Sequence, residues 1–243
     1  MIYSSDQIIN KLTTWDFKDI GLHPEGSNYV FLVRLEPKIE TGENILAIYK
    51  PIKGERPLVD FKYGSLHNRE KASWLISRVL GWPNLPPVIV RDGPHGLGSV
   101  QLYIHSNHNK NYFTERDVRL SEFMKIAMFD VLTNNADRKG GSCLFETGNS
   151  TIWAIDHGLT FNFYTNIRTV MFEFVSVEYP EELIADICNL VKKIQTENDF
   201  SNKIIECLEQ NEIDGLITRA KSMSLEGKFP LLNPSVNVPW PLL

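Results

Sequence analysis

The sequence predicts an α+β protein with two lobes, a small sheet-rich N-terminal lobe and a helical C-terminal lobe. Residues 1–104 are dominated by short β-branched or aromatic runs bounded by Gly, Pro or Asn, as is typical of strands. After residue 115, apolar residues recur at helical spacing instead. We therefore place one lobe at residues 1–104 and the other at residues 105–243, joined near the polar loop 105–113.

Four segments of the N-terminal lobe are predicted strands, and one helix interrupts them. The strands are expected at residues 29–35, 45–49, 87–90 and 99–104. An apolar stripe over residues 68–80 predicts a helix that packs on these strands, and Gly81 is expected to end it. Gly93, Gly96 and Gly98 are expected to supply positive φ to a turn between the last two strands.

The C-terminal lobe is predicted to be mainly helical. An apolar face over residues 123–132 predicts a helix that runs straight into Asn134, and further helical patterns cover residues 181–194 and 204–223. One pair of short strands is expected on either side of residues 148–150. The loop after the first helix would therefore be held by a rigid element.

Composition limits the classes of function. The 243 residues are 42% hydrophobic, enough for a sizeable core, and their net charge of -5 argues against a nucleic-acid-binding surface over the whole chain. The three cysteines are too few and too scattered for a disulfide framework, which fits a reducing compartment. No run approaches the roughly 18 apolar residues of a membrane span, and no signal-peptide pattern is present. We therefore expect a cytoplasmic protein.

Three features of the N-terminal lobe match parts that phosphoryl transfer needs. Gly26, Ser27 and Asn28 form a turn-like tripeptide before a predicted strand, where backbone N–H groups could approach phosphate oxygens. Lys50 ends a predicted strand in the context A-I-x-K and could pair with phosphate. Glu70, on the predicted helix, is the candidate carboxylate that holds the lysine in place. The alternative interpretations are that residues 26–28 form a plain turn, that Lys50 is a solvated charge at the edge of the sheet, and that Glu70 is a solvated glutamate.

Two aspartates of the C-terminal lobe carry more of the argument. Asp137 follows the predicted helix within NNADRKGG, so its carboxylate would be presented on a loop held by a rigid element. Arg138 and Lys139 add positive charge that an anionic transition state could use. Asp156 emerges at a strand end within AIDHG. One carboxylate could accept a hydroxyl proton while the other holds Mg²⁺ through hard oxygen atoms. The alternative is two turn-capping aspartates.

Two other patterns give little support to different chemistry. His105 and His108 are spaced as HxxH, but no Cys or acidic partner stands at metal-ligand spacing. Cys143 lies beside the aspartate motif without an obvious histidine base. Zinc binding and nucleophilic hydrolysis are therefore disfavoured.

The two aspartate motifs also carry a family resemblance. NNADRKGG, followed by AIDHG with its aspartate 19 residues after the first, resembles the DRxxxN and DFG pair of the phosphatidylinositol 3-/4-kinase superfamily and the related HipA-type kinases. More of the chain resembles a family of uncharacterised bacterial proteins described as phosphatidylinositol 3-/4-kinase-like. The matching segments are GSNYVFLV, YKPIKGERPLVDFKYGSLHNRE, LGWPNLPPVIVRDGPHGLGSVQLYI, and FDVLTNNADRKGG with IDHG. They cover most of residues 15–165, and the resemblance implies a two-lobed protein-kinase-like fold.

The resemblance implies a role for individual residues. Lys50 would contact the phosphates of ATP, and Glu70 would orient it. Asp137 would be the catalytic-loop aspartate, and Asp156 would be the metal-binding aspartate. Residues 101–104, which include Gln101 and Tyr103, would lie against the adenine and offer backbone hydrogen bonds.

Two positions depart from the family pattern. Ser142 stands where these kinases have a metal-binding Asn, so the second metal contact would come through water, from Asn134 or Asn135, or be absent. His157 stands in place of the Phe of DFG, which argues against an apolar packing switch at this point.

These residues lead to the hypothesis of an ATP- and Mg²⁺-dependent phosphotransferase that acts on a hydroxyl of a protein, a small molecule or an inositol lipid. The chain has no polybasic run or basic amphipathic helix, so stable membrane association is not expected. One alternative, motivated by Ser142, is a nucleotide-binding pseudokinase that acts as a regulatory or scaffolding module. Another is transfer of AMP, because that chemistry uses the same lysine and carboxylates.

Overall fold

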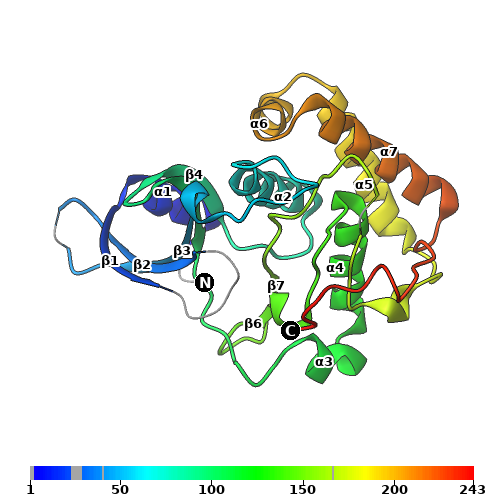
Figure 1. The fold of residues 1–243 in the computed structure, drawn as a ribbon, viewed down its shortest axis with the longest axis horizontal. Helices are drawn as coiled ribbons and strands as arrows, with labels where there is room; N and C mark the ends of the chain where they lie inside the picture. The colour runs from blue at the N-terminus through cyan, green and yellow to red at the C-terminus, as the bar shows by residue number, and fades with distance from the viewer. Residues whose placement is uncertain (1–2, 23–28, 40, 166) are drawn as a thin grey trace.

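The computed structural model describes residues 3–22, 29–39, 41–165 and 167–243. A five-stranded sheet and one helix form its N-terminal part, and most of the other helices gather in its C-terminal part (Figure 1). The predicted α+β fold class is confirmed. Among the residues described, no helix has the length and apolar character needed to cross a membrane.

The sheet of the N-terminal part is antiparallel, with the strand order β1-β2-β3-β5-β4. The strands are β1 (Asp16–Leu22), β2 (Phe31–Glu36), β3 (Ile45–Pro51), β4 (Val88–Gly93) and β5 (Gly96–Leu102). Along β3, buried and half-buried residues alternate, because successive side chains of a strand point to opposite faces. Ala47 and Tyr49 lie on the face that Ile8 and Leu12 of helix α1 (Ser5–Thr14) cover. Lys50 lies on the other face.

The three glycines of the β4–β5 hairpin serve two different purposes. Gly96 has a φ of 96°, as expected of a turn glycine. Gly93 and Gly98 do not have positive φ, so the sequence prediction was wrong for these two. A Cβ on Gly98 would lie 2.4 Å from the backbone oxygen of Lys50, and a Cβ on Gly93 would meet the ring of Tyr49. Gly98 therefore allows β5 to approach β3 closely at Lys50, and Gly93 leaves room for the ring of Tyr49.

Helix α2 (Leu66–Leu80) lies between the two parts of the chain (Figure 1). Gly81 ends it with a φ of 78°, in the left-handed conformation of a C-terminal cap, which confirms the predicted end of the helix. Ala72 and Ile76 belong to the same apolar core as the helices of the C-terminal part, and α2 also contacts β4 and β5. The expectation that its apolar stripe packs on the strands was therefore incomplete. This shared position lets one helix connect the sheet to the C-terminal loops.

The C-terminal part contains five α-helices and a two-stranded sheet within the described residues. The helices are α3 (Tyr112–Glu115), α4 (Leu120–Thr133), α5 (Glu181–Gln195), α6 (Asp199–Cys207) and α7 (Gln210–Glu226). Strands β6 (Cys143–Phe145) and β7 (Ile152–Ala154) form the predicted hairpin. The helical pattern predicted over residues 204–223 is divided between α6 and α7, because the chain is extended at Leu208, with φ -124° and ψ 146°.

The segment after α7 returns to the loop that follows α4, as the red end of the ribbon in Figure 1 shows. The backbone N–H of Gly140 donates to the carbonyl of Leu242 at 2.8 Å, and that of Thr169 donates to the carbonyl of Asn237 at 2.9 Å. The Asn237 amide donates in turn to the carbonyl of Ile167 at 2.8 Å. Residues 237–242 therefore support the loop that contains Asp137.

Candidate active site

Lys50 joins the sheet to the helical part through two carboxylates. Its Nζ lies 2.8 Å from Oε1 of Glu70 and 2.8 Å from Oδ1 of Asp156. Burial alone would lower the pKa of Lys50, but Asp156 and Glu70 outweigh burial and raise it, so the ammonium stays charged. Oε2 of Glu70 also accepts a hydrogen bond from the backbone N–H of His157 at 3.2 Å. Glu70 thus connects the lysine to the loop that follows β7.

Asp156 is presented at the end of β7 in an uncommon backbone conformation. Its φ is 61°, in the left-handed region that L-residues seldom adopt. Its side chain is 53% exposed, whereas that of Glu70 is 6% exposed. The surrounding protein would raise the pKa of Asp156, but Lys50 more than offsets this and lowers it. The structure therefore offers an ionised carboxylate that is open to a ligand.

Asp137 lies on the loop after α4, as predicted. Helix α4 ends at Asn134, whose φ is 54°, and the next residue, Asn135, accepts a hydrogen bond from the Asp137 backbone N–H at 3.0 Å. The Asp137 carboxylate lies 3.1 Å from Nζ of Lys139. Burial raises the pKa of Asp137; Lys139 acts in the opposite direction, and the nearby Asp156 adds to the rise. We call Lys50, Glu70, Asp137 and Asp156 the site cluster.

Arg138 does not lie in the site cluster, although the sequence hypothesis gave it a catalytic role. It is 0% exposed, and its Nε and Nη2 donate to the two carboxylate oxygens of Asp130 at 2.7 and 2.9 Å. Its Nη1 donates to the carbonyls of Ser142 and Ile155 at 3.1 and 3.0 Å, and Nη2 contacts Nε2 of His157 at 2.8 Å. Since these bonds use all five N–H donors, a direct contact with a ligand is ruled out in this arrangement. We call Asp130, Arg138 and His157 the interior cluster.

Ser142 lies next to the site cluster, and its backbone is what fixes its position. Its carbonyl accepts a hydrogen bond from the N–H of Ile155 at 3.0 Å, one residue before Asp156. Asn135 is buried, donates to Asp130 at 2.8 Å and accepts from Asp137, so both ends of its amide are engaged within the protein. The suggestion that Asn135 supplies a second metal contact does not fit this geometry.

Asn134, the other residue suggested for a second metal contact, is fixed through the nitrogen of its amide. It is buried, and its Nδ2 donates to the carbonyls of Asn162 and Tyr164 at 3.0 and 2.7 Å. These bonds direct the amide toward the loop after Asp156. The predicted phosphate turn at Gly26, Ser27 and Asn28 lies outside the described residues.

Gln101 and Tyr103 belong to the sheet and its extension. Gln101 is buried in β5, and the N–H groups of Leu102 and Tyr103 donate to the carbonyls of Pro87 and Leu46 at 2.8 and 3.0 Å. These two donors are therefore occupied within the protein, which does not match the expected backbone hydrogen bonds to an adenine at these positions.

A hollow of about 410 Å³ lies on the face of the sheet that carries Lys50. Gly21, Leu32 and Leu46 are among its lining residues. The strand register pairs Gly21 with Leu32 and Leu32 with Ile48, which is two residues from Lys50, so all of them share one face. The hollow is therefore a continuation of the lysine face, mostly apolar and open to solvent.

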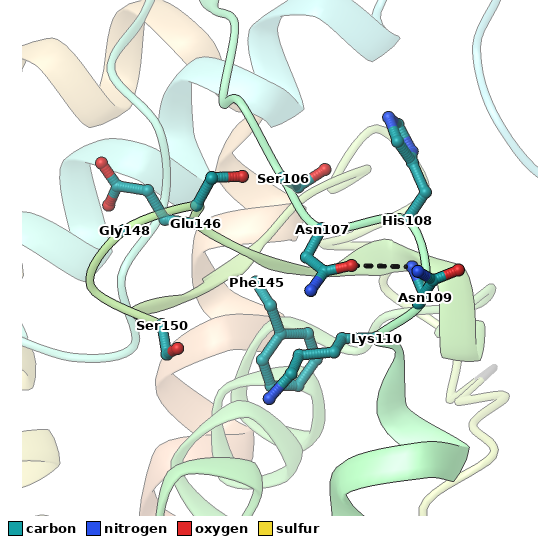
Figure 2. A pocket seen from close by; sticks show the side chains of 10 residues that line it. Ser106, Asn107, His108, Asn109, Lys110, Phe145, Glu146, Gly148 and Ser150 are labelled. Carbon is teal, nitrogen blue, oxygen red and sulfur yellow. Dashed lines mark hydrogen bonds between the residues drawn. The ribbon is translucent and has the colours of Figure 1, made fainter.

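A second hollow, of about 390 Å³, lies beside the linker between the two parts (Figure 2). The linker is attached to the β6–β7 hairpin, because the N–H of Asn107 donates to the carbonyl of Phe145 at 2.9 Å and that of Thr147 donates to the carbonyl of His105 at 2.8 Å. Within the linker, Oδ1 of Asn107 accepts a hydrogen bond from the N–H of Asn109 at 3.0 Å. The dashed line in Figure 2 marks this bond. Of the predicted site residues that the structure describes, none lines this hollow.

Neither Asp130 nor the apolar hollow was predicted from the sequence. Asp130 is an acidic residue between Phe129 and Val131 in the apolar second half of helix α4, and such a residue is seldom buried unless it is paired. The position of Asp130 among apolar residues was the signal in the sequence that could have indicated a buried ion pair. Cys143, which the sequence placed beside the site, is fully buried, and burial raises the pKa of its thiol to about 12, so it is not a nucleophile.

Comparisons with known proteins agree on the fold. No protein-family model matches the chain. Protein Rv2133c of Mycobacterium tuberculosis is 28% identical over 232 residues, which is 80% of this chain and 81% of that protein. The Golgi casein kinase structure has a TM-score of 0.54 at 15% identity, covering 93% of this chain and 76% of its own, and its Mn/ADP-bound form has a TM-score of 0.53 at 15% identity, covering 97% and 82%.

Hydra Fam20, solved with a sugar, gives a similar result. Its TM-score is 0.55 at 12% identity, covering 91% of this chain and 88% of its own. At these identities the likeness concerns the fold, and the chain has a kinase-like α+β fold with a sheet-rich N-terminal part and a helical C-terminal part.

Proposed function

We propose that this chain is an ATP- and Mg²⁺-dependent phosphotransferase, an atypical kinase that acts on a hydroxyl group. One observation supports it above all: Lys50 pairs with Glu70 and with Asp156, close to Asp137. Phosphoryl transfer needs a cation for the phosphates, a carboxylate for the metal and a base for the acceptor. The site cluster contains a candidate for each of these parts.

The hollow on the lysine face is the proposed adenine site. Leu32, Leu46 and Gly21 line it, and its volume of about 410 Å³ is adequate for a ring system of this size. Lys50 lies on the same face, farther along β3, where it could pair with the phosphates of a nucleotide held there. This orientation would place the phosphates beside Asp156.

The carboxylates of Asp156 and Asp137 are hard oxygen donors, which is the chemistry that Mg²⁺ prefers. Asp156 is ionised and half exposed, and it is the residue that would hold the ion. When bound, the ion would neutralise charge on the phosphate oxygens. The hydroxyl of the buried Ser142 would be a weaker ligand for the ion than these carboxylates, because it is neutral.

Asp137 is the proposed base. Its carboxylate would accept the proton of the acceptor hydroxyl as that oxygen forms a bond to the γ-phosphorus and the bond to the ADP oxygen breaks. Lys139, 3.1 Å from Asp137, supplies positive charge beside the transferred group. The proposed acceptor of the phosphoryl group is a hydroxyl of a protein, a small molecule or an inositol lipid. Assignment to the phosphatidylinositol 3-/4-kinase-like or HipA-like kinases rests on the Asp137 and Asp156 motifs.

The test is transfer from ATP by purified protein in the presence of Mg²⁺, followed as ADP release and as self-phosphorylation. Asp137→Asn is expected to lower the rate by about 10² to 10⁴-fold, because the base is lost and the shape is kept. Asp199→Asn, at an exposed position of α6, is the matched control and should retain the wild-type rate. Equal rates for wild type and Asp137→Asn would refute the proposal.

Ser142 favours a second candidate, a nucleotide-binding pseudokinase with a regulatory or scaffolding role. In that case the protein would bind ATP equally well with and without Mg²⁺, and no transfer would be detected. Intact-mass measurement after incubation with ATP also separates transfer of phosphate from transfer of AMP, because the two groups add very different masses.

The adenine site is tested by filling the hollow. Leu46→Trp is expected to weaken ATP binding about tenfold, which corresponds to about 1.4 kcal/mol, because the indole would occupy the space proposed for the base. Leu97→Trp, at a position of β5 that is 41% exposed, is the control. Unchanged ATP affinity in Leu46→Trp, measured by calorimetry, would place the nucleotide elsewhere.

A further inference from the structure

The interior cluster contacts the residues on both sides of the strained residue of the proposed metal loop. Asp156 has a φ of 61°, and a non-glycine residue in this region costs on the order of 1 kcal/mol or more unless its surroundings hold it. The residues on both sides of it are bonded to one guanidinium: the Ile155 carbonyl accepts from Arg138 at 3.0 Å, and Nε2 of His157 lies 2.8 Å from Arg138. Arg138 therefore spans the residue that would hold the metal.

The guanidinium of Arg138 is itself held in place by Asp130. Asp130, at the end of α4, accepts from Nε and Nη2 of Arg138 through both of its oxygens, at 2.7 and 2.9 Å. The same carboxylate accepts from Asn135, which holds the backbone N–H of Asp137. The positions of Asp137 and Asp156 are therefore set by one buried network that starts at Asp130.

His157 is the part of this network that the family pattern does not supply. A guanidinium only donates hydrogen bonds, so Nε2 of His157 must be the acceptor. The ring is 1% exposed and packs edge to face on Phe129, at 5.5 Å between centroids. Its backbone N–H donates to Glu70, and its carbonyl accepts from the Thr160 hydroxyl at 2.7 Å. The imidazole is thus held in place to receive Arg138.

We propose that Arg138 and His157 are positioning residues that hold Asp156 in its left-handed, metal-binding conformation. The inference rests on the proposed function, since it assigns Asp156 to a divalent cation. Neither residue touches the ligand, and both act through Asp156. Residues that orient a metal ligand in this way typically change metal affinity by 10 to 100-fold when they are replaced.

The experiment measures Mn²⁺ binding by electron paramagnetic resonance in the presence of a non-hydrolysable ATP analogue. His157→Phe keeps the buried ring and removes the acceptor, and it is expected to weaken Mn²⁺ binding by about tenfold or more. Affinity for the analogue in EDTA should be unchanged, which a general loss of structure would not allow. His157→Gln restores an acceptor and should bind Mn²⁺ within about threefold of wild type.

Two further variants make the outcomes distinct. Asp130→Asn loosens the anchor of Arg138 from the opposite side and should weaken Mn²⁺ binding in the same direction, which gives a result if His157→Phe does not fold. Asp156→Asn is the reference. If it weakens Mn²⁺ binding while His157→Phe and Asp130→Asn bind as tightly as wild type, the positioning role is overturned. If Asp156→Asn also binds Mn²⁺ like wild type, the proposed function fails with it.

Discussion

Asp130 and Asp156 each pair with a basic side chain, but in opposite surroundings. Asp130 is 1% exposed, and its partner Arg138 is 0% exposed. Asp156 is 53% exposed, and its partner Lys50 is 26% exposed. The first pair is closed to solvent and has every guanidinium donor in use. The second has a carboxylate that can turn to a new partner while it remains in contact with water.

Charge in this molecule therefore has two separate uses. A buried pair is costly to break, because the remaining charge has no solvent to receive it. An exposed pair contributes little to stability and exchanges partners readily. The interior cluster is therefore suited to hold loops, and the site cluster is suited to meet a ligand. Three predictions test this division.

The largest effect is expected from matched neutral substitutions in the two pairs. Asp130→Asn should lower the free energy of unfolding by about 3–5 kcal/mol, because it leaves Arg138 buried without its counter-ion. Asp156→Asn should lower it by about 1 kcal/mol or less. The measurement is urea unfolding of both variants beside wild type. Equal losses of stability would remove the distinction between the clusters.

The next effect concerns the pH dependence of stability. Burial, with Arg138 and Lys50 nearby, holds the pKa of His157 well below its ordinary value. The unfolded chain takes up a proton near pH 6.5 and the folded chain does not, so the free energy of unfolding falls as the pH drops below that value. One such proton accounts for about 1.4 kcal/mol per pH unit. His157→Gln should flatten the decline between pH 6.5 and pH 5, measured by urea unfolding.

A steeper or unchanged decline in His157→Gln would assign the lost stability to other groups. His95→Gln is the control, since this ring stacks on Phe31 in the N-terminal part, far along the chain from the interior cluster. It should keep the wild-type decline.

The smallest effect is expected within the site cluster. Lys139 lowers the pKa of Asp137, against the rise that burial causes. A base must be ionised to act, so Lys139→Met should raise this pKa further and move the acid limb of the rate profile to higher pH. The measurement is the transfer rate against pH, with Lys203→Met on α6 as the control. A shift to lower pH would contradict the assignment of Asp137 as the base.

Sequence patterns predicted the fold class because the strongest signals were local. The alternating strand β3, the glycine cap of α2 and the β6–β7 hairpin each depend on neighbouring residues. Strand β1 gave no such signal, because most of its residues are exposed and no apolar alternation marks it. The break at Leu208 was hidden because helices α6 and α7 carry apolar residues on both sides of it.

Some residues of the site could be predicted from the sequence and others could not, and the reason is physical. Lys50, Glu70 and Asp156 could be proposed because each stands at the end of a strand or on a helix with a clear period. The buried position of Arg138 could not be predicted, because a basic residue between Asp137 and Lys139 is expected to be solvated. It is buried because it pairs with Asp130 in the folded chain. That pairing depends on how the chain turns after α4, which no local pattern specifies.

The return of residues 237–242 to the loop at Gly140 has a consequence for synthesis. These residues follow Gly140 by about a hundred positions, which a ribosome adds in on the order of 10 s. Until residues 237–242 have been added, the backbone N–H groups of Gly140 and Thr169 have no access to the carbonyls of Leu242 and Asn237. A nascent chain would therefore complete the support of its aspartate loop only after helix α7 has emerged.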